Sequence, residues 1–118
     1  MNVDAIQKSL REFAEERDWN RFHSPKNIAT ALAVEAAELL ENFQWLTEEE
    51  SRRLAERPED FRAVREEIAD VQIYLLRLAD LLGVDLEAAV RDKLALNAAK
   101  YPVALAKGKA LKYNRLRP

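Results

Sequence analysis

Four carboxylates in two pairs are the residues of this 118-residue chain whose spacing best suits chemistry: Glu35 with Glu38, and Glu67 with Asp70. Each pair has i, i+3 spacing, which on a helix puts both side chains on one face with their Cβ atoms about 5–6 Å apart. Four acids that converge repel one another and are costly to bury unless a cation joins them. The two pairs therefore predict a divalent-metal site.

The flanking residues separate this interpretation from the commoner one, in which such pairs form a solvated acidic face. Glu35 and Glu38 are flanked by Ala and Leu rather than by Lys and Arg, so no local ion pair neutralises them. An apolar stripe runs beside the acids in each segment, so packing of the two segments would bring the pairs together. Tyr74 and Arg77 follow the second pair at helical spacing and are suited to bind a ligand.

The all-oxygen ligand set favours Mg²⁺, with Mn²⁺ as the alternative, over zinc. Magnesium held by a few carboxylates usually completes its shell with water and substrate phosphates, so the site suggests phosphate chemistry. Two metal ions about 3.5–4 Å apart would also fit, and the metal count stays open. A di-iron carboxylate site is disfavoured because it uses Glu-x-x-His motifs, whereas the single histidine, His23, lies elsewhere.

Composition excludes several classes of protein. The net charge of −2 excludes a strongly basic, general nucleic-acid binder, so no nucleic-acid polymer is expected as a partner. The absence of cysteine excludes a disulfide framework, a thiolate metal site and a cysteine nucleophile. No 18-residue apolar run and no signal-peptide core are found, so we expect a cytoplasmic protein without membrane partners. The length predicts one domain, residues 1–118.

Apolar residues at helical spacing predict four long helices, at about residues 3–17, 25–43, 58–82 and 86–100. Ser24-Pro25 is a helix start, and Thr47 with Glu50 predicts a capping box on a short connecting helix. Gly83 is the residue expected just after a helix end. Nothing indicates a strand, so we expect an all-α fold, a four-helix bundle.

The third long segment carries two neighbouring stripes. Its predicted core stripe consists of Val64, Ile68, Val71, Leu75, Leu78 and Leu82. The stripe beside it consists of Glu67, Asp70, Tyr74 and Arg77. The metal ligands and the ligand-binding side chains are therefore expected along one face of one helix.

Phosphate recognition must come from side chains, because the chain has neither a GxxxxGK[ST] loop nor a GxGxxG motif. Lys93, Asn97 and Lys100 with Tyr101 lie on one face of the last long helix and could hold a polyphosphate; an ordinary exposed face explains them as well. Four aromatic residues lie at helix ends and could stack a nucleobase or simply pack the core: Trp19, Phe22, Phe43 and Trp45.

These residues together give the chain a family resemblance. It resembles the all-α nucleoside triphosphate pyrophosphohydrolases, the MazG-like group, and within that group most closely the dCTP pyrophosphatase branch. The segments that carry the resemblance, in the family's order, run from Glu16 to His23, from Glu35 to Trp45 with its Phe-Gln-Trp end, from Glu67 to Tyr74, from Lys93 to Asn97, and from Lys100 to Pro102.

The resemblance implies Mg²⁺-dependent hydrolysis of a (deoxy)nucleoside triphosphate, dCTP or a related pyrimidine, to the monophosphate and pyrophosphate, an activity that cleans the nucleotide pool. It implies that the metal ligands are Glu35, Glu38, Glu67 and Asp70, with Glu38 or Glu41 activating the water. It places Trp19, His23, Trp45 and Tyr74 around the base and sugar, and Lys93, Asn97 and Tyr101 on the phosphates. It also implies a homo-oligomer, a tetramer or dimer, with sites built from more than one subunit.

Two matters stay open at this stage. The dCTP-specific members carry a histidine where this chain has Leu10, so the preferred base, or a modified nucleotide as substrate, is not assigned. The alternative to an enzyme is a non-catalytic helical module that binds nucleotides or another protein, in which the acids would be a solvated face.

Overall fold

The computed structural model describes all 118 residues, which form helices and connecting segments with no strand. The helices are α1 (Val3–Glu16), η1 (Asn20–Phe22), α2 (Pro25–Glu41), α3 (Glu48–Arg52), η2 (Leu54–Glu56), α4 (Pro58–Leu82), α5 (Leu86–Lys100), α6 (Val103–Ala106) and η3 (Tyr113–Arg115). The chain divides into two compact units, Met1–Gly83 and Val84–Pro118. The prediction of an all-α protein is therefore confirmed. None of the helices is both long and apolar enough to cross a membrane.

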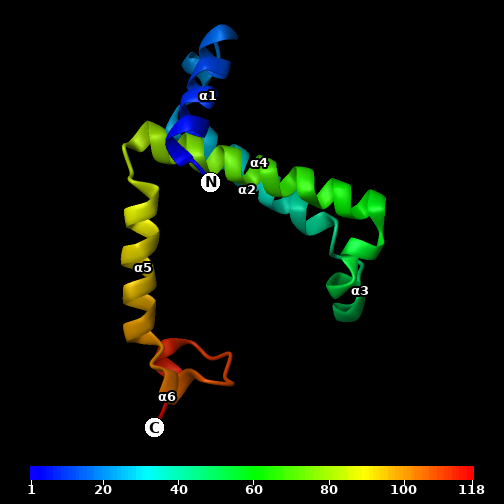
Figure 1. Cartoon of the computed structure of the whole chain (residues 1–118), viewed down its shortest axis with the longest axis vertical. Helices are drawn as coiled ribbons and strands as arrows, with labels where there is room; N and C mark the ends of the chain where they lie inside the picture. The colour runs from blue at the N-terminus through cyan, green and yellow to red at the C-terminus, as the bar shows by residue number, and fades with distance from the viewer. The chain divides into compact units, whose positions relative to one another are not determined.

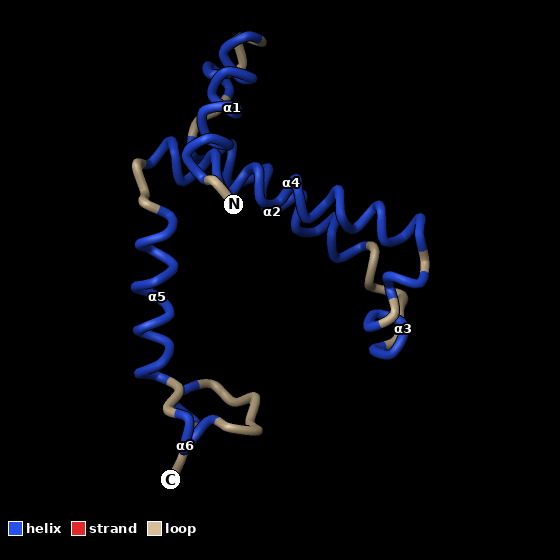
Figure 2. Tube along the Cα trace, in the orientation of Figure 1, coloured by secondary structure: helices blue, strands red, loops and turns tan.

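In the first unit, α2 and α4 lie side by side along most of the length of α2 (Figures 1 and 2). Ile28 on α2 and Val64 on α4 are buried, as is Leu54 on η2 before α4. Ser24 caps α2 by accepting a hydrogen bond from the Asn27 amide, as the sequence predicts. This pairing brings the segment with Glu35 against the segment with Glu67.

Helix α1 packs on the second half of α4 through both apolar and polar contacts. Ala14 and Leu76 are each only 1% exposed. The Gln7 side chain, also buried, donates a hydrogen bond from Nε2 to the Leu76 carbonyl at 3.0 Å. Arg11 adds an ion pair to Asp80, in which Nη1 donates to both carboxylate oxygens at 2.7 and 2.8 Å. The position of α1 on α4 is thus fixed at several points.

The end of α1 turns the chain sharply and places Trp19. Asp18 adopts a left-handed conformation, with φ of +54°. Its amide bonds to the Glu15 carbonyl, and the Trp19 amide bonds to the Ala14 carbonyl, which together form a Schellman motif. The Trp19 ring then packs edge-on against Phe13, with centroids 5.6 Å apart, the apolar contact that usually accompanies this motif.

The predicted core stripe of α4 is only partly correct. Val64 is buried, but Ile68, Leu75 and Leu82 are exposed in the chain, Ile68 by 55% and Leu82 by 58%. The buried residues in the second half of the helix are Leu76, Arg77 and Ala79. The face of α4 that meets α1 therefore includes Leu76 and Asp80, which Gln7 and Arg11 contact, and is not the most apolar stripe.

The second unit contains α5, which begins and ends where the sequence predicts, with Asp85 accepting a hydrogen bond from the Ala88 amide as its N-cap. No residue of α5 is buried. Beyond it, Leu116 is buried, and the Lys100 ammonium lies 5.1 Å from the centre of the Tyr113 ring. Gly83, at φ +66°, ends α4 just before this unit.

The packing of α1 on α4 can be tested at Leu76. We expect Leu76→Ala to lower the free energy of unfolding by about 2–5 kcal/mol, because the truncation leaves a cavity between the two helices. Leu111→Ala, at a residue that is 44% exposed, should cost less than about 1 kcal/mol. Urea unfolding at one protein concentration measures both. Equal losses would contradict the packing described here.

Candidate functional site

Three of the four predicted carboxylates meet where α2 faces α4. One oxygen from each of Glu35, Glu38 and Glu67 lies within 4.8 Å of the other two. Glu35 and Glu67 are half-buried, and the Oε2 atom of each is fully shielded from solvent without a hydrogen-bond donor in the protein. Shielded carboxylate oxygens without donors are unfavourable unless a proton or a cation lies between them.

The electrostatics of this cluster raise the pKa of Glu35 from 4.5 to about 7. The largest cause is the facing carboxyl of Glu67, with which a protonated Glu35 can share a hydrogen bond; burial and the charge of Glu38 act in the same direction. Near neutral pH the cluster therefore holds a proton readily when no cation is bound. A divalent cation would take the place of that proton, since the donor set contains only carboxylate oxygens.

The other two acidic residues proposed from the sequence lie on opposite sides of the cluster. Asp70 is outside the group of three mutually close carboxylates and lines an adjoining pocket. Glu41 lines a shallow, open hollow that Glu38 and Glu67 also border. The structure thus places Asp70 towards the pocket and Glu41 towards solvent.

The pocket between α1, η1 and α4 has a volume of about 300 Å³ and mostly apolar walls. Its lining consists of Leu10, Phe13, Ala14, Trp19, His23, Asp70, Ile73, Tyr74 and Arg77. Three of the side chains predicted to surround the base and sugar, Trp19, His23 and Tyr74, are therefore brought together next to Asp70. Flat aromatic and aliphatic walls with a few polar groups suit a ring-shaped ligand.

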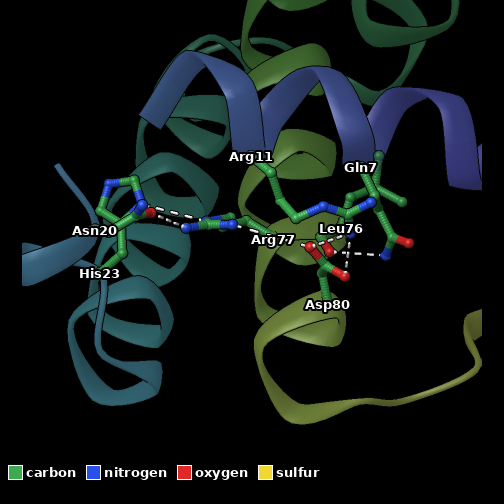
Figure 3. A network of polar contacts seen from close by, with 7 residues as sticks. All are labelled: Gln7, Arg11, Asn20, His23, Leu76, Arg77 and Asp80. Carbon is green, nitrogen blue, oxygen red and sulfur yellow. Dashed lines mark hydrogen bonds and ion pairs between the residues drawn. The ribbon is translucent and has the colours of Figure 1, made fainter. Parts of the chain in front are cut away.

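Arg77 also lines the pocket, and its side chain is only 8% exposed. Figure 3 shows its polar partners. Its Nε donates to His23 Nδ1 at 3.3 Å, and its Nη2 donates to Asn20 Oδ1 at 2.7 Å. Its Nη1 lies 3.9 Å from Asp80, which also holds Arg11. Burial, and next the Arg77 charge, lower the pKa of His23 below its usual 6.5, so the imidazole is neutral at neutral pH.

The remaining predicted residues are not gathered at this pocket. Trp45 lies beyond the end of α2 with 86% of its surface exposed and is not among the pocket residues. Lys93 and Asn97 on α5, and Tyr101 just after it, belong to the second unit. Their contacts with phosphate stay a prediction.

Several pocket residues were not foreseen as site residues. Phe13 and Ile73 line the pocket but were not predicted as site residues, and neither was Asn20, which accepts a hydrogen bond from Arg77. Arg77 could be found, because it follows Tyr74 on the stripe that begins at Glu67. Leu10, singled out as a departure from the dCTP-specific pattern, proves to line the pocket.

Comparisons with known sequences identify the family of the chain. The MazG-like family matches residues 30–116. dCTP pyrophosphatase 1 of Rattus norvegicus is 44% identical over 114 residues, which make up 97% of this chain and 67% of that protein. The Homo sapiens protein of the same name is 42% identical over the same shares. A dATP/dGTP diphosphohydrolase of Cyanophage S-2L is 59% identical over 34 residues, 29% of this chain and 32% of that protein.

A solved structure is similar over most of the chain. The crystal structure of a pyrophosphatase from Archaeoglobus fulgidus superposes with a TM-score of 0.76 at 42% sequence identity. The match covers 86% of this chain and 94% of that one. Family, sequence relatives and fold therefore agree: the chain belongs to the MazG-like family and is a nucleoside triphosphate pyrophosphatase.

Proposed function

We propose that this pyrophosphatase hydrolyses a pyrimidine deoxynucleoside triphosphate, with dCTP as the leading candidate, to the monophosphate and pyrophosphate with Mg²⁺. The observation that carries the proposal is the place of the carboxylate cluster next to the apolar pocket, with Asp70 at the pocket end. Such an arrangement can hold the phosphate end of a nucleotide at the acids and its base in the pocket.

The carboxylates are proposed to bind the metal through Glu35, Glu38 and Glu67, with Asp70 as the ligand nearest the pocket. The shielded Oε2 atoms of Glu35 and Glu67, which have no donor, support this assignment. When bound there, Mg²⁺ would activate the attacking water and offset the charge of the departing pyrophosphate. Mn²⁺ could substitute because it accepts the same oxygen ligands.

The reaction needs a group that accepts a proton from the attacking water. A bond forms from the water oxygen to the α-phosphorus, the bond from that phosphorus to the bridging oxygen of the pyrophosphate breaks, and the water proton passes to a carboxylate. Glu38 is proposed for this role because it belongs to the cluster, and Glu41 is the alternative because it borders the same hollow.

The nucleoside is proposed to occupy the pocket between Trp19, His23 and Tyr74, where Trp19 offers an aromatic edge or face to the base. Lys93, Asn97 and Tyr101 are proposed to contact the phosphates, and Trp45 to cover the base. The 86% exposure of Trp45 supports a partner for it, since an indole left in water forfeits a large apolar contact.

Base choice is proposed to depend on the wall formed by Leu10, Phe13 and Ile73. The Leu10 side chain cannot form a hydrogen bond. At that position the pocket can therefore select a base only by its shape. The relatives bear names with different bases, dCTP for one and dATP/dGTP for another. The proposal of dCTP therefore rests on the longer match, over 97% of the chain.

A homo-oligomer, with four-helix packing completed by a second copy, is proposed from the apolar surface that the single chain exposes. Val90, Leu94 and Leu96 on α5 are each more than half exposed, and so are Val34 and Leu40 on α2. A monomer seldom leaves so many large apolar side chains in water. A second copy of the chain is the proposed occupant of these faces.

The activity is tested by product analysis with dCTP and Mg²⁺. We expect dCMP and pyrophosphate, not orthophosphate, as first products, and a fall in kcat/KM of more than about a hundredfold in Glu67→Gln, because a direct metal ligand is lost. Glu59→Gln, an exposed residue on the same helix, should retain full activity. Orthophosphate as first product, or no turnover of any common triphosphate, would contradict the proposal and favour a non-catalytic binding module.

The proton held by Glu35 leads to a prediction about the pH dependence of stability, for the protein in excess EDTA. Because its pKa is about 7 when folded and about 4.5 when unfolded, its stabilising contribution is full below pH 4.5 and is lost as the pH rises through 7. Glu35→Gln carries no charge and keeps a donor for Glu67. We therefore expect it to raise the Tm at pH 8 by about 4 °C, the change that about 1 kcal/mol produces.

Magnesium should reverse the order of the Tm values of the wild type and Glu35→Gln at pH 8. Saturating Mg²⁺ should raise the Tm of the wild type but not that of Glu35→Gln, which has lost a ligand. Glu12→Gln, an exposed residue on α1, should behave as the wild type in both conditions. Differential scanning calorimetry measures all three proteins. A Gln variant that is less stable than the wild type in EDTA at pH 8 would refute the shared proton.

The oligomer is tested by sedimentation velocity. We expect a species of two or four chains at micromolar concentration, and a shift towards the monomer in Leu94→Lys, because a buried ammonium has no partner in an apolar interface. Asn114→Lys adds the same charge at an exposed polar position of the second unit and should not change the mass. A monomer throughout would rule out the second copy.

A further inference from the structure

We propose that Arg77 is a positioning residue of this site: it fixes His23 in the tautomer with the proton on Nε2, so that the imidazole presents only a donor to an oxygen of the bound nucleoside. The substrate-binding half of this proposal rests on the proposed function, whereas the tautomer itself does not.

The tautomer follows from what Arg77 can offer. The guanidinium Nε lies 3.3 Å from His23 Nδ1 (Figure 3). Arginine has five N–H donors, no acceptor, and does not lose its proton in proteins. A hydrogen bond between the two nitrogens therefore requires Nδ1 to be the acceptor, without a proton. In a neutral imidazole the proton must then be on Nε2.

The guanidinium has further partners, which make it a rigid support for the ring. Asn20 Oδ1 accepts from Nη2 at 2.7 Å, and Asp80 lies 3.9 Å from Nη1. Asp80 is fixed in turn by Arg11 on α1, whose Nη1 donates to both carboxylate oxygens. Arg77 thus has charge and hydrogen-bond partners inside the first unit and does not need the substrate for neutralisation.

The consequence for binding is that His23 recognises acceptors. Its ring lines the pocket together with Trp19 and Tyr74, and Asp70 is the acidic side chain in the lining. A base carbonyl oxygen or a sugar oxygen can accept from Nε2–H, whereas an amino group cannot. If the acceptor is the carbonyl oxygen beside the glycosidic bond, His23 does not distinguish the pyrimidines from one another, since each presents that oxygen.

The single histidine of the chain makes the tautomer directly measurable. Two-bond ¹H–¹⁵N NMR of the substrate-free protein at pH 8 should show one imidazole, with a protonated Nε2 and an Nδ1 whose signal is shifted by hydrogen bonding. In Arg77→Met the Nδ1 signal should lose that shift and show partial protonation. Arg62→Met, an exposed arginine of the same helix, is the matched control and should leave both signals unchanged. A protonated Nδ1 in the wild type overturns the proposal without any variant.

Kinetics test whether the role is exerted through His23. We expect Arg77→Met and His23→Leu each to raise the KM by about tenfold, the effect of about one hydrogen bond, with kcat changed less than about threefold. His23→Gln, whose amide can donate from nearly the same place, should recover most of the loss. In the His23→Leu background, Arg77→Met should have little further effect on KM, because the two residues act as one unit. Independent, multiplying effects would overturn the positioning role.

A dideoxy analogue of the substrate separates the two possible oxygens. If Nε2–H donates to the base, His23→Leu should raise the KM equally for the deoxy and 2′,3′-dideoxy triphosphates. If it donates to the 3′-oxygen, only the deoxy substrate should be affected. No change for either overturns the donor role. If no triphosphate is hydrolysed at all, the proposed function fails, while the NMR result still decides the tautomer.

Discussion

The structure depends on a contact that is unfavourable by itself: Glu35 on α2 faces Glu67 on α4, with one shielded oxygen on each side and no donor between them. The two helices are held together by apolar contacts around Ile28 and Val64. The repulsion between the acids must be relieved locally, by a proton or by a cation. A cation bound there would therefore also stabilise the pairing of α2 and α4.

The second constraint on the structure is a buried positive charge, that of Arg77. A buried guanidinium is costly unless its charge and its donors are satisfied, and here Asp80, Asn20 and His23 satisfy it. Those three partners come from α4 itself and from the segment between α1 and α2. Arg77 therefore ties the aromatic turn after α1 to α4. Because Asp80 also holds Arg11, the position of α1, which supplies the apolar wall of the pocket, depends on the same group of charges.

Much of this arrangement could be predicted from spacing alone. The i, i+3 acids, the neighbouring stripe from Glu67 to Arg77, and the bounds of α4 and α5 all follow from helical periodicity and end signals. The stripe of α4 that is buried within the chain could not be predicted. Periodicity ranks faces by hydrophobicity, and the most apolar face, with Ile68 and Leu82, is the exposed one.

Two local features could not be predicted from the sequence either, for different physical reasons. The left-handed residue after α1 is Asp18, whereas a glycine is the usual sequence signal for that conformation. The sequence therefore does not predict the turn that places Trp19. The sequence does not predict the burial of Arg77 either, since a charged side chain is ordinarily expected in solvent. Two of the partners that bury it, His23 and Asn20, lie more than 50 residues away in the chain.

The register of α4 gives the site a direction. Glu67 lies in the carboxylate cluster, Asp70 and Tyr74 border the pocket one and two turns later, and Arg77 supports its far wall. Each turn advances about 5.4 Å, so the order along the helix matches the order phosphate, sugar and base in the proposed substrate. On α4, the proposed metal ligands and the residues that border the pocket thus follow one another along one helix. A change at Leu10 can alter the shape offered to the base without moving Glu35, Glu38 or Glu67, because Leu10 borders the pocket and not the cluster. Relatives named for dCTP and for dATP/dGTP can on this account share one phosphate chemistry and differ in the wall that faces the base.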